Sequence, residues 1–174
     1  MNNLLFSHPF RKGFQVVLLL ALLLFNLGIS VAYAAPPPAN DDFETATVVG
    51  GIAYSDTVDT SQADVQAGDP DAIGYPDLVC DGSALSQGYK SIWYKYTAPT
   101  KGIISADTIG TDPSGNPALT YDTYIAIWTG TSLGNLTLVA CDDSVFATQD
   151  AQVTWRATAG ATYYIEVAQF KCYY

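Results

Sequence analysis

The sequence predicts an all-β domain, an antiparallel β-sandwich of the jelly-roll kind with about seven to eight short strands. Short runs of β-branched and aromatic residues recur along the chain and are separated by turn residues. Helical periodicity is nearly absent, apart from one expected turn at 42–47 that Asp42 would cap. Strand runs that follow one another without intervening helices are typical of antiparallel sheets.

The expected strands follow in order from residues 51–58 (GIAYSDTV), a candidate first strand. In residues 91–98 apolar and polar positions alternate, which places Ile92, Tyr94 and Tyr96 on one face. Turn residues between neighbouring runs then predict three hairpins. These pair 91–98 with 103–108, 124–130 with 136–142, and 151–157 with 162–168. Residues 60–90 and 109–120 are rich in Asp, Gly and Pro, and long loops of this kind are often functional.

Residues 1–34 have the pattern of an export signal. A basic pair precedes an apolar stretch at 14–31, and a small-x-small site follows, with cleavage expected between Ala34 and Ala35. A retained membrane anchor is the alternative, because roughly 18 apolar residues can span a bilayer. We therefore expect a proline-rich spacer at 35–39 and a single domain at 40–174, secreted to the extracellular space or the cell surface.

The expected exported chain is strongly acidic. The full sequence has 7 basic and 17 acidic residues, and removal of the signal takes two basic residues, for a net charge of −12. Nucleic acids and anionic membranes both require a basic surface, so we expect neither as a partner. An extracellular protein or a polysaccharide is the expected class of partner.

Catalytic groups are scarce after cleavage. The only histidine, His8, lies in the signal, so a serine nucleophile would have no imidazole base. A Ser-Lys pair using Lys90, Lys95 or Lys101 stays open, as does a hydrolase built on paired aspartates. We predict that the protein is not an enzyme.

Three cysteines, Cys80, Cys141 and Cys172, lie in a chain bound for an oxidising compartment. Three pairings are possible, and we favour Cys80 with Cys141, which leaves Cys172 over. That bridge would close a loop of about 60 residues and stabilise the domain by about 4 kcal/mol in the chain-entropy model.

Acidic residues at strand ends are the candidate metal ligands. Asn40, Asp41 and Asp42 offer oxygen atoms of the kind that calcium prefers, although Asp41 or Asp42 capping the first helical turn is the competing interpretation. Asp142 and Asp143 follow an expected strand, where turn capping is the simpler explanation. No cofactor other than calcium is expected.

Three tryptophans lie within expected strands: Trp93, Trp128 and Trp155. Exposed in a row, they would suit stacking on sugars, and a carbohydrate-binding module is therefore an alternative function. Large aromatic side chains more often fill sandwich cores, so we expect them to be buried.

Five segments occur in an order that is specific in combination: NDDF (40–43), SIWYKYTAPTKG (91–102), YDTYIAIWTG (121–130), LVACDDS (138–144) and TAGATYYIEV (158–167). Together they resemble the bacterial pre-peptidase C-terminal type domain, a secreted β-sandwich often appended to exported proteases and adhesins. The resemblance implies a non-catalytic module that assists secretion, targeting or adhesion. It also implies calcium near Asn40 and Asp41, as in the related collagen-binding domains of secreted collagenases.

The chain departs from this pattern after residue 168. Family members continue with a glycine turn and a final strand, whereas this sequence ends in QFKCYY (169–174). The resemblance therefore implies that the C-terminal strand is missing, which would leave a sheet edge unpaired. A truncated, non-functional fragment of a larger exported protease or adhesin is a further alternative.

Overall fold

The computed structural model describes residues 34–70, 89–111, 122–143 and 150–169. Contacts divide the chain into two units, 1–34 and 35–174, and the second contains all the described strands. The division falls at the expected signal cleavage site.

The described elements confirm the all-β prediction. Among the described residues there are seven strands and two short 3-10 turns, and no helix is longer than one turn. In chain order they are η1 (Phe43–Thr45), β1 (Thr47–Val49), β2 (Tyr89–Thr97), β3 (Gly102–Asp107), β4 (Thr123–Thr129), η3 (Leu133–Asn135), β5 (Thr137–Asp142), β6 (Gln152–Ala157) and β7 (Thr162–Gln169).

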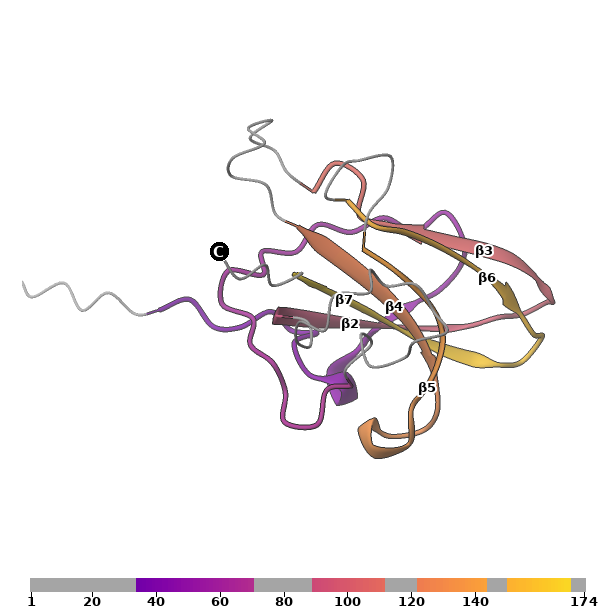
Figure 1. Cartoon of the computed structure of the whole chain (residues 1–174), viewed down its shortest axis with the longest axis horizontal. Coiled ribbons are helices and arrows are strands. Elements are labelled where there is room, and N and C mark those ends of the chain that lie inside the picture. The colour runs from indigo at the N-terminus through magenta and orange to yellow at the C-terminus, as the bar shows by residue number, and fades with distance from the viewer. Residues whose placement is uncertain (1–33, 71–88, 112–121, 144–149, 170–174) are drawn as a thin grey trace, which may run out of the picture. The chain divides into compact units, whose positions relative to one another are not determined.

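The strands form two sheets of unequal size (Figure 1). The larger has five strands in the order β1-β2-β7-β4-β5, and the smaller consists of β3 and β6. β1 runs parallel to β2, so the larger sheet is mixed rather than purely antiparallel as predicted. The described strands establish the all-β class and two sheets in contact, but not a complete sandwich.

Residues 51–58 do not form the predicted first strand. The first strand is β1, and residues 51–58, which follow it, make no ladder with a described strand. Ala53 has φ 70, in the left-handed region that strands do not use, so the backbone turns there. The alternation of apolar residues in 51–58 therefore does not correspond to a sheet.

Only one of the three predicted hairpins is present, the pairing of β4 with β5. β2 pairs with β7 and β3 pairs with β6, so the turns after β2 and β6 carry the chain from one sheet to the other. These two turns are bonded to each other: the Ala98 N–H donates to Ala161 O at 2.9 Å, and the Gly160 N–H donates to Ala98 O at 2.7 Å. A turn signal alone does not distinguish a hairpin from such a crossing.

The larger sheet is covered on both faces, which explains why six of the seven residues of β4 are buried. One face packs on Phe43 of η1 and contains Trp93 and Trp128. The other face packs against the smaller sheet through Val153 and Trp155 of β6. All three tryptophans are thus core residues, exposed by 0%, 0% and 5% in sequence order.

Candidate functional site

The segment that contains the predicted calcium ligands is bonded to the edge of the core. Asn40 and Trp93 exchange two hydrogen bonds: the Trp93 N–H donates to Asn40 O at 2.8 Å, and Asn40 Nδ2 donates to Trp93 O at 3.1 Å. The Asn40 side chain is buried. Asn40 therefore gives β2 a further hydrogen-bond partner besides the strands β1 and β7.

Asp41 and Asp69 connect this segment to the loop before β2. Asp41 Oδ1 accepts the Asp64 N–H at 3.1 Å. Asp69 Oδ2 accepts the Gln66 N–H at 3.0 Å and the Ser91 hydroxyl at 2.7 Å. These carboxylates take the place of regular secondary structure in holding residues 60–70.

Both carboxyl groups have perturbed titration. Burial raises the pKa of Asp41, and the charges of Asp64 and Asp42 add to that rise. Burial also raises the pKa of Asp69, which its hydrogen bond from Ser91 partly offsets. Burial is thus the main influence against ionisation of both carboxyl groups, and the neighbouring negative charges are a smaller one.

The predicted calcium ligands Asn40, Asp41 and Asp42 make hydrogen bonds or face solvent, and the calcium site stays a prediction. Within the described ranges, no three His, Cys, Asp or Glu side chains are placed to hold a metal ion. The Asn40 amide and one oxygen of Asp41 are already hydrogen-bonded, and Asp42 is exposed. Asp42 does occupy the cap position of η1, although its side chain makes no capping hydrogen bond. The geometry fits a structural role for Asn40 and Asp41.

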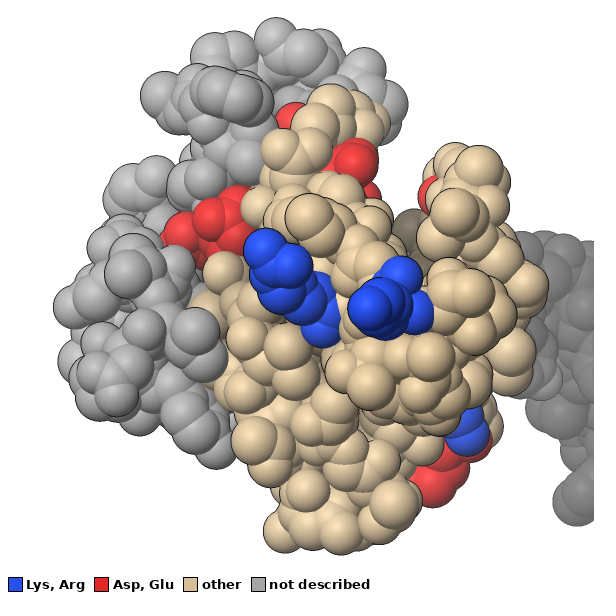
Figure 2. Space-filling model, turned by 90° about the vertical axis from the view of Figure 1, so that its right-hand side faces the viewer, with Lys and Arg blue, Asp and Glu red and all other residues tan. Residues whose placement is uncertain are grey.

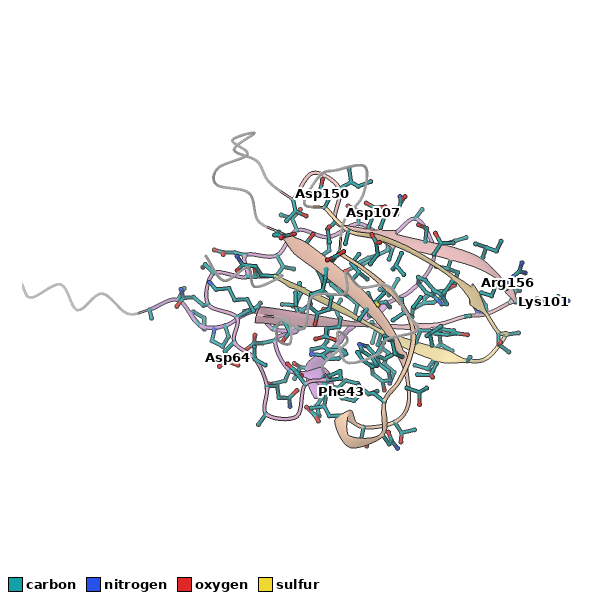
Figure 3. The ribbon with its side chains drawn as sticks, in the orientation of Figure 1. Phe43, Asp64, Lys101, Asp107, Asp150 and Arg156 are labelled. Carbon is teal, nitrogen blue, oxygen red and sulfur yellow. The ribbon has the colours of Figure 1, made fainter. Side chains whose placement is uncertain are left out.

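The acidic strand ends come together at one end of the smaller sheet. Asp107 ends β3 and pairs with Gln152, whose N–H donates to Asp142 Oδ2 at 2.9 Å. Asp150 Oδ2 accepts the Gly110 N–H at 3.3 Å. Figure 3 shows Asp107 and Asp150 at this end, and Lys101 and Arg156 at the opposite end. Asp143, the remaining candidate of this group, is buried.

A groove of about 860 Å³ lies beside the edge of β3. Consecutive residues of β3, from Ile103 to Asp107, line one wall, and consecutive residues 51–58 line the other. Because neighbouring strand residues point to opposite faces, such a lining means that the groove follows the edge of β3. Its floor belongs to the face of the larger sheet that packs on the smaller one, where Ile92, Tyr96 and Ile165 are buried and Tyr94 and Val167 are half-buried.

Exposed apolar side chains gather at this groove. Five large apolar residues are exposed in the described parts of the chain, and four of them line it, all but Val48. These four are Ile52, Tyr54, Ile103 and Ile109, exposed by 77%, 45%, 68% and 56%. Exposed apolar side chains that gather in one place are typical of interaction sites.

A tyrosine pair lies at the wall of the groove. The rings of Tyr54 and Tyr94 meet edge to face with centroids 6.1 Å apart. Both hydroxyls donate to Asp56 Oδ2, at 3.1 Å from Tyr54 and 3.4 Å from Tyr94. Burial and the nearby Asp56 charge raise the pKa of Tyr94 far above its ordinary value, so its hydroxyl stays neutral.

Sequence reasoning missed this site. Ile52 and Tyr54 are two positions apart, which is also the pattern of a half-buried strand. The sequence therefore predicts a candidate strand at 51–58 instead of a groove wall. The groove depends on the smaller sheet covering only part of the larger one, and no local pattern reports that.

A buried carboxylate, Glu166 on β7, also escaped the sequence analysis. Its two oxygens accept the Tyr124 hydroxyl at 2.7 Å and the Trp128 indole N–H at 2.9 Å. It is fully buried and 0% exposed. Glu166 thus joins β4 and β7 inside the core.

Two lysines considered for catalysis have other contacts. Lys90 Nζ donates to Ser61 O at 2.7 Å, and Lys95 Nζ lies 5.5 Å from the centre of the Tyr164 ring. Lys101 is exposed at the turn before β3.

Some predicted residues fall outside the described parts. Cys80 and Cys172 do, so the bond between Cys80 and Cys141 stays a prediction. So do most of the export signal and the C-terminal segment after residue 169. No helix of the described residues is long and apolar enough to cross a membrane.

Comparison with known proteins supplies no relative. No protein-family model matches the chain, and neither a curated protein nor a solved structure matches it. The resemblance to the pre-peptidase C-terminal type domain therefore stays a prediction from the sequence.

Proposed function

We propose that the protein is an exported, non-catalytic β-domain that binds another extracellular protein through the groove beside β3. Such a module would assist the secretion, targeting or adhesion of the polypeptide that carries it. The observation that carries the proposal is the position of Ile52, Tyr54, Ile103 and Ile109, four exposed apolar side chains around one groove.

The lining favours protein over sugar. The lining mixes aliphatic side chains such as Ile103, Ile104 and Val167 with polar and aromatic ones. Three of its four exposed large apolar side chains are isoleucines, which cannot stack on a sugar ring as an aromatic side chain does. The tryptophans on which the carbohydrate alternative depended lie in the core. Tyr54 is the aromatic residue at the groove with the most exposed surface.

The carboxylates support a structural rather than a catalytic role. Asp41, Asp69 and Glu166 each accept hydrogen bonds that tie one chain segment to another. A two-carboxylate hydrolase requires its acids to face a substrate cleft. The acids lining the groove, Asp56 and Asp107, are bonded to neighbouring tyrosines and to the Ile109 N–H.

Binding of the exported chain to immobilised matrix proteins and polysaccharides tests the proposal. We expect retention on at least one protein surface and on no polysaccharide. Ile52→Asp should weaken retention about tenfold, since it places a charge in an apolar contact. Val48→Asp is the matched control, because Val48 is 71% exposed and lies outside the groove lining.

Two results would overturn the proposed class of function. The first is retention on polysaccharide alone, and the second is saturable turnover of a peptide, ester or glycoside substrate by the purified chain. Equal retention of the Ile52→Asp and Val48→Asp variants would show that the groove is not the binding surface.

A further inference from the structure

The structure assigns a specific kind of occupant to the groove: an extended strand of a partner polypeptide, antiparallel to β3. This strand has apolar residues at alternate positions, a basic residue at its N-terminal end and an acidic residue at its C-terminal end. The inference rests on the proposed function and names the chemistry of the partner.

The backbone of β3 provides the first argument. All six residues of β3 pair with β6, and no other described strand pairs with β3. In an antiparallel pair, alternate residues direct their N–H and C=O groups away from the partner strand. Those groups of β3 therefore face the groove, where an added strand can bond to them, as in other cases of strand addition.

The floor of the groove provides the second argument. A strand laid beside β3 directs every second side chain onto the larger sheet. There it meets Ile92, Tyr94, Ile165 and Val167. The intervening side chains point outward, on the face where Ile103 is exposed. Ile92 and Ile165 are already buried there, so an alternating apolar strand would cover the surface that Tyr94 and Val167 still expose.

Charge ties the direction of the added strand to the order of its own charges. Lys101 and Arg156 lie where β3 begins, and Asp107 and Asp150 lie where it ends (Figure 3). Figure 2 views the basic end and shows blue side chains close together on a mostly uncharged surface. An antiparallel strand begins beside Asp107 and ends beside Lys101. A basic residue at its N-terminal end and an acidic residue at its C-terminal end would therefore each face a residue of opposite charge. Exposed pairs contribute little affinity, but they select orientation.

The second wall limits the size of the occupant. Residues 51–58 bound the groove opposite β3, so a strand added to β3 would have this segment, rather than open space for a further sheet edge, on its other side. A second copy of this chain would bring such a sheet edge and a second net charge of −10 or lower. A segment of a different polypeptide is therefore the better occupant.

A synthetic peptide tests this directly with the full exported chain. The probe has about eight residues, alternates valine and threonine, begins with lysine, ends with glutamate and has blocked termini. Its control exchanges the lysine and the glutamate. Fluorescence anisotropy should show saturable binding of the probe, about tenfold tighter than the control at low salt, with the difference shrinking at high salt.

Protein variants locate the binding. Ile103→Asp should weaken binding of the probe about tenfold or more, because it removes an apolar contact and repels the glutamate. Val48→Asp changes the same kind of exposed side chain away from the groove and should bind as the unmodified chain does. Near-ultraviolet circular dichroism checks that both variants are folded.

Several results would overturn the inference: no saturable binding, equal binding of both peptides, equal binding by the two variants, or a dimer of the chain alone that Ile103→Asp dissociates. These results can be told apart from a failure of the proposed function. If a matrix protein is retained and Ile52→Asp weakens that retention while no peptide binds, the function stands and the strand occupant is wrong.

Discussion

Asn40 and Trp93 hold the start of the domain to its central sheet through a reciprocal pair of hydrogen bonds, at 2.8 and 3.1 Å. One of these bonds is made by a buried side-chain amide. Asn40 was predicted as a calcium ligand, yet its position makes it a backbone partner for β2.

Removal of the Asn40 amide should destabilise the domain. Asn40→Ala leaves the buried Trp93 carbonyl without its side-chain donor, and the expected loss is about 1–3 kcal/mol in the free energy of unfolding. Asn40→Asp should cost at least as much, because it replaces the donor by a charge. Urea unfolding measures both, with Asp42→Ala, an exposed neighbour, as the control. An effect of Asn40→Ala no larger than that of the control would contradict the structural role.

Replacement of Glu166 by glutamine should also destabilise the core. The carboxylate accepts from two donors, Tyr124 and Trp128, and an amide presents an acceptor to only one of them. The Trp128 indole can only donate and keeps the amide oxygen, while the Tyr124 hydroxyl exchanges a carboxylate acceptor for a weaker bond from the amide N–H, at a cost of about 1 kcal/mol. Thermal unfolding monitored by tryptophan fluorescence provides the measurement. A melting temperature equal to that of the unmodified chain would mean that these bonds contribute little.

Stability should depend on pH through Asp69. Burial raises its pKa in the folded chain above the ordinary value of 3.8, so the folded state retains a proton that the unfolded state has lost. The stabilisation is complete below the unfolded pKa and is lost as pH rises through the folded pKa. Asp69→Asn keeps an acceptor oxygen for Ser91 and should flatten this decline. Unfolding midpoints across the acidic range measure the slope, with Asp107→Asn as the control because Asp107 is exposed and far from Asp69 in the fold. Equal slopes in both variants would refute the assignment.

Calcium should leave stability unchanged if Asn40, Asp41 and Asp42 are structural residues, as their hydrogen bonds indicate. We therefore expect the same calorimetric midpoint in excess calcium and in chelator. A ligand that binds only the folded state raises the midpoint with its concentration. Such a rise, if Asp41→Asn abolishes it, would show that calcium binds at Asp41.

Sequence reasoning succeeded where local pattern decides the structure. Alternation in 91–98 predicted the two faces of β2, and the tryptophans were correctly expected in the core. Turn residues between β4 and β5 predicted a true hairpin, where the Asn135 side chain accepts the Thr131 and Ser132 N–H groups.

Sequence reasoning failed where the pairing of distant segments decides the structure. The turns after β2 and β6 have ordinary hairpin chemistry, yet Ala98 and Gly160 bond to each other across the two crossings. The groove follows from the same topology, because β3 pairs only with β6 among the described strands. Spacing along the sequence carries no information on which sheet a strand joins.

Hydrogen exchange at the backbone of β3 tests the central claim most directly. With the lysine-first, glutamate-last peptide added, we predict slower exchange of the amides in Gly102–Asp107. Exchange at β5, the strand at one edge of the larger sheet, should not change. Unchanged exchange in β3, or protection confined to β5, would contradict the account.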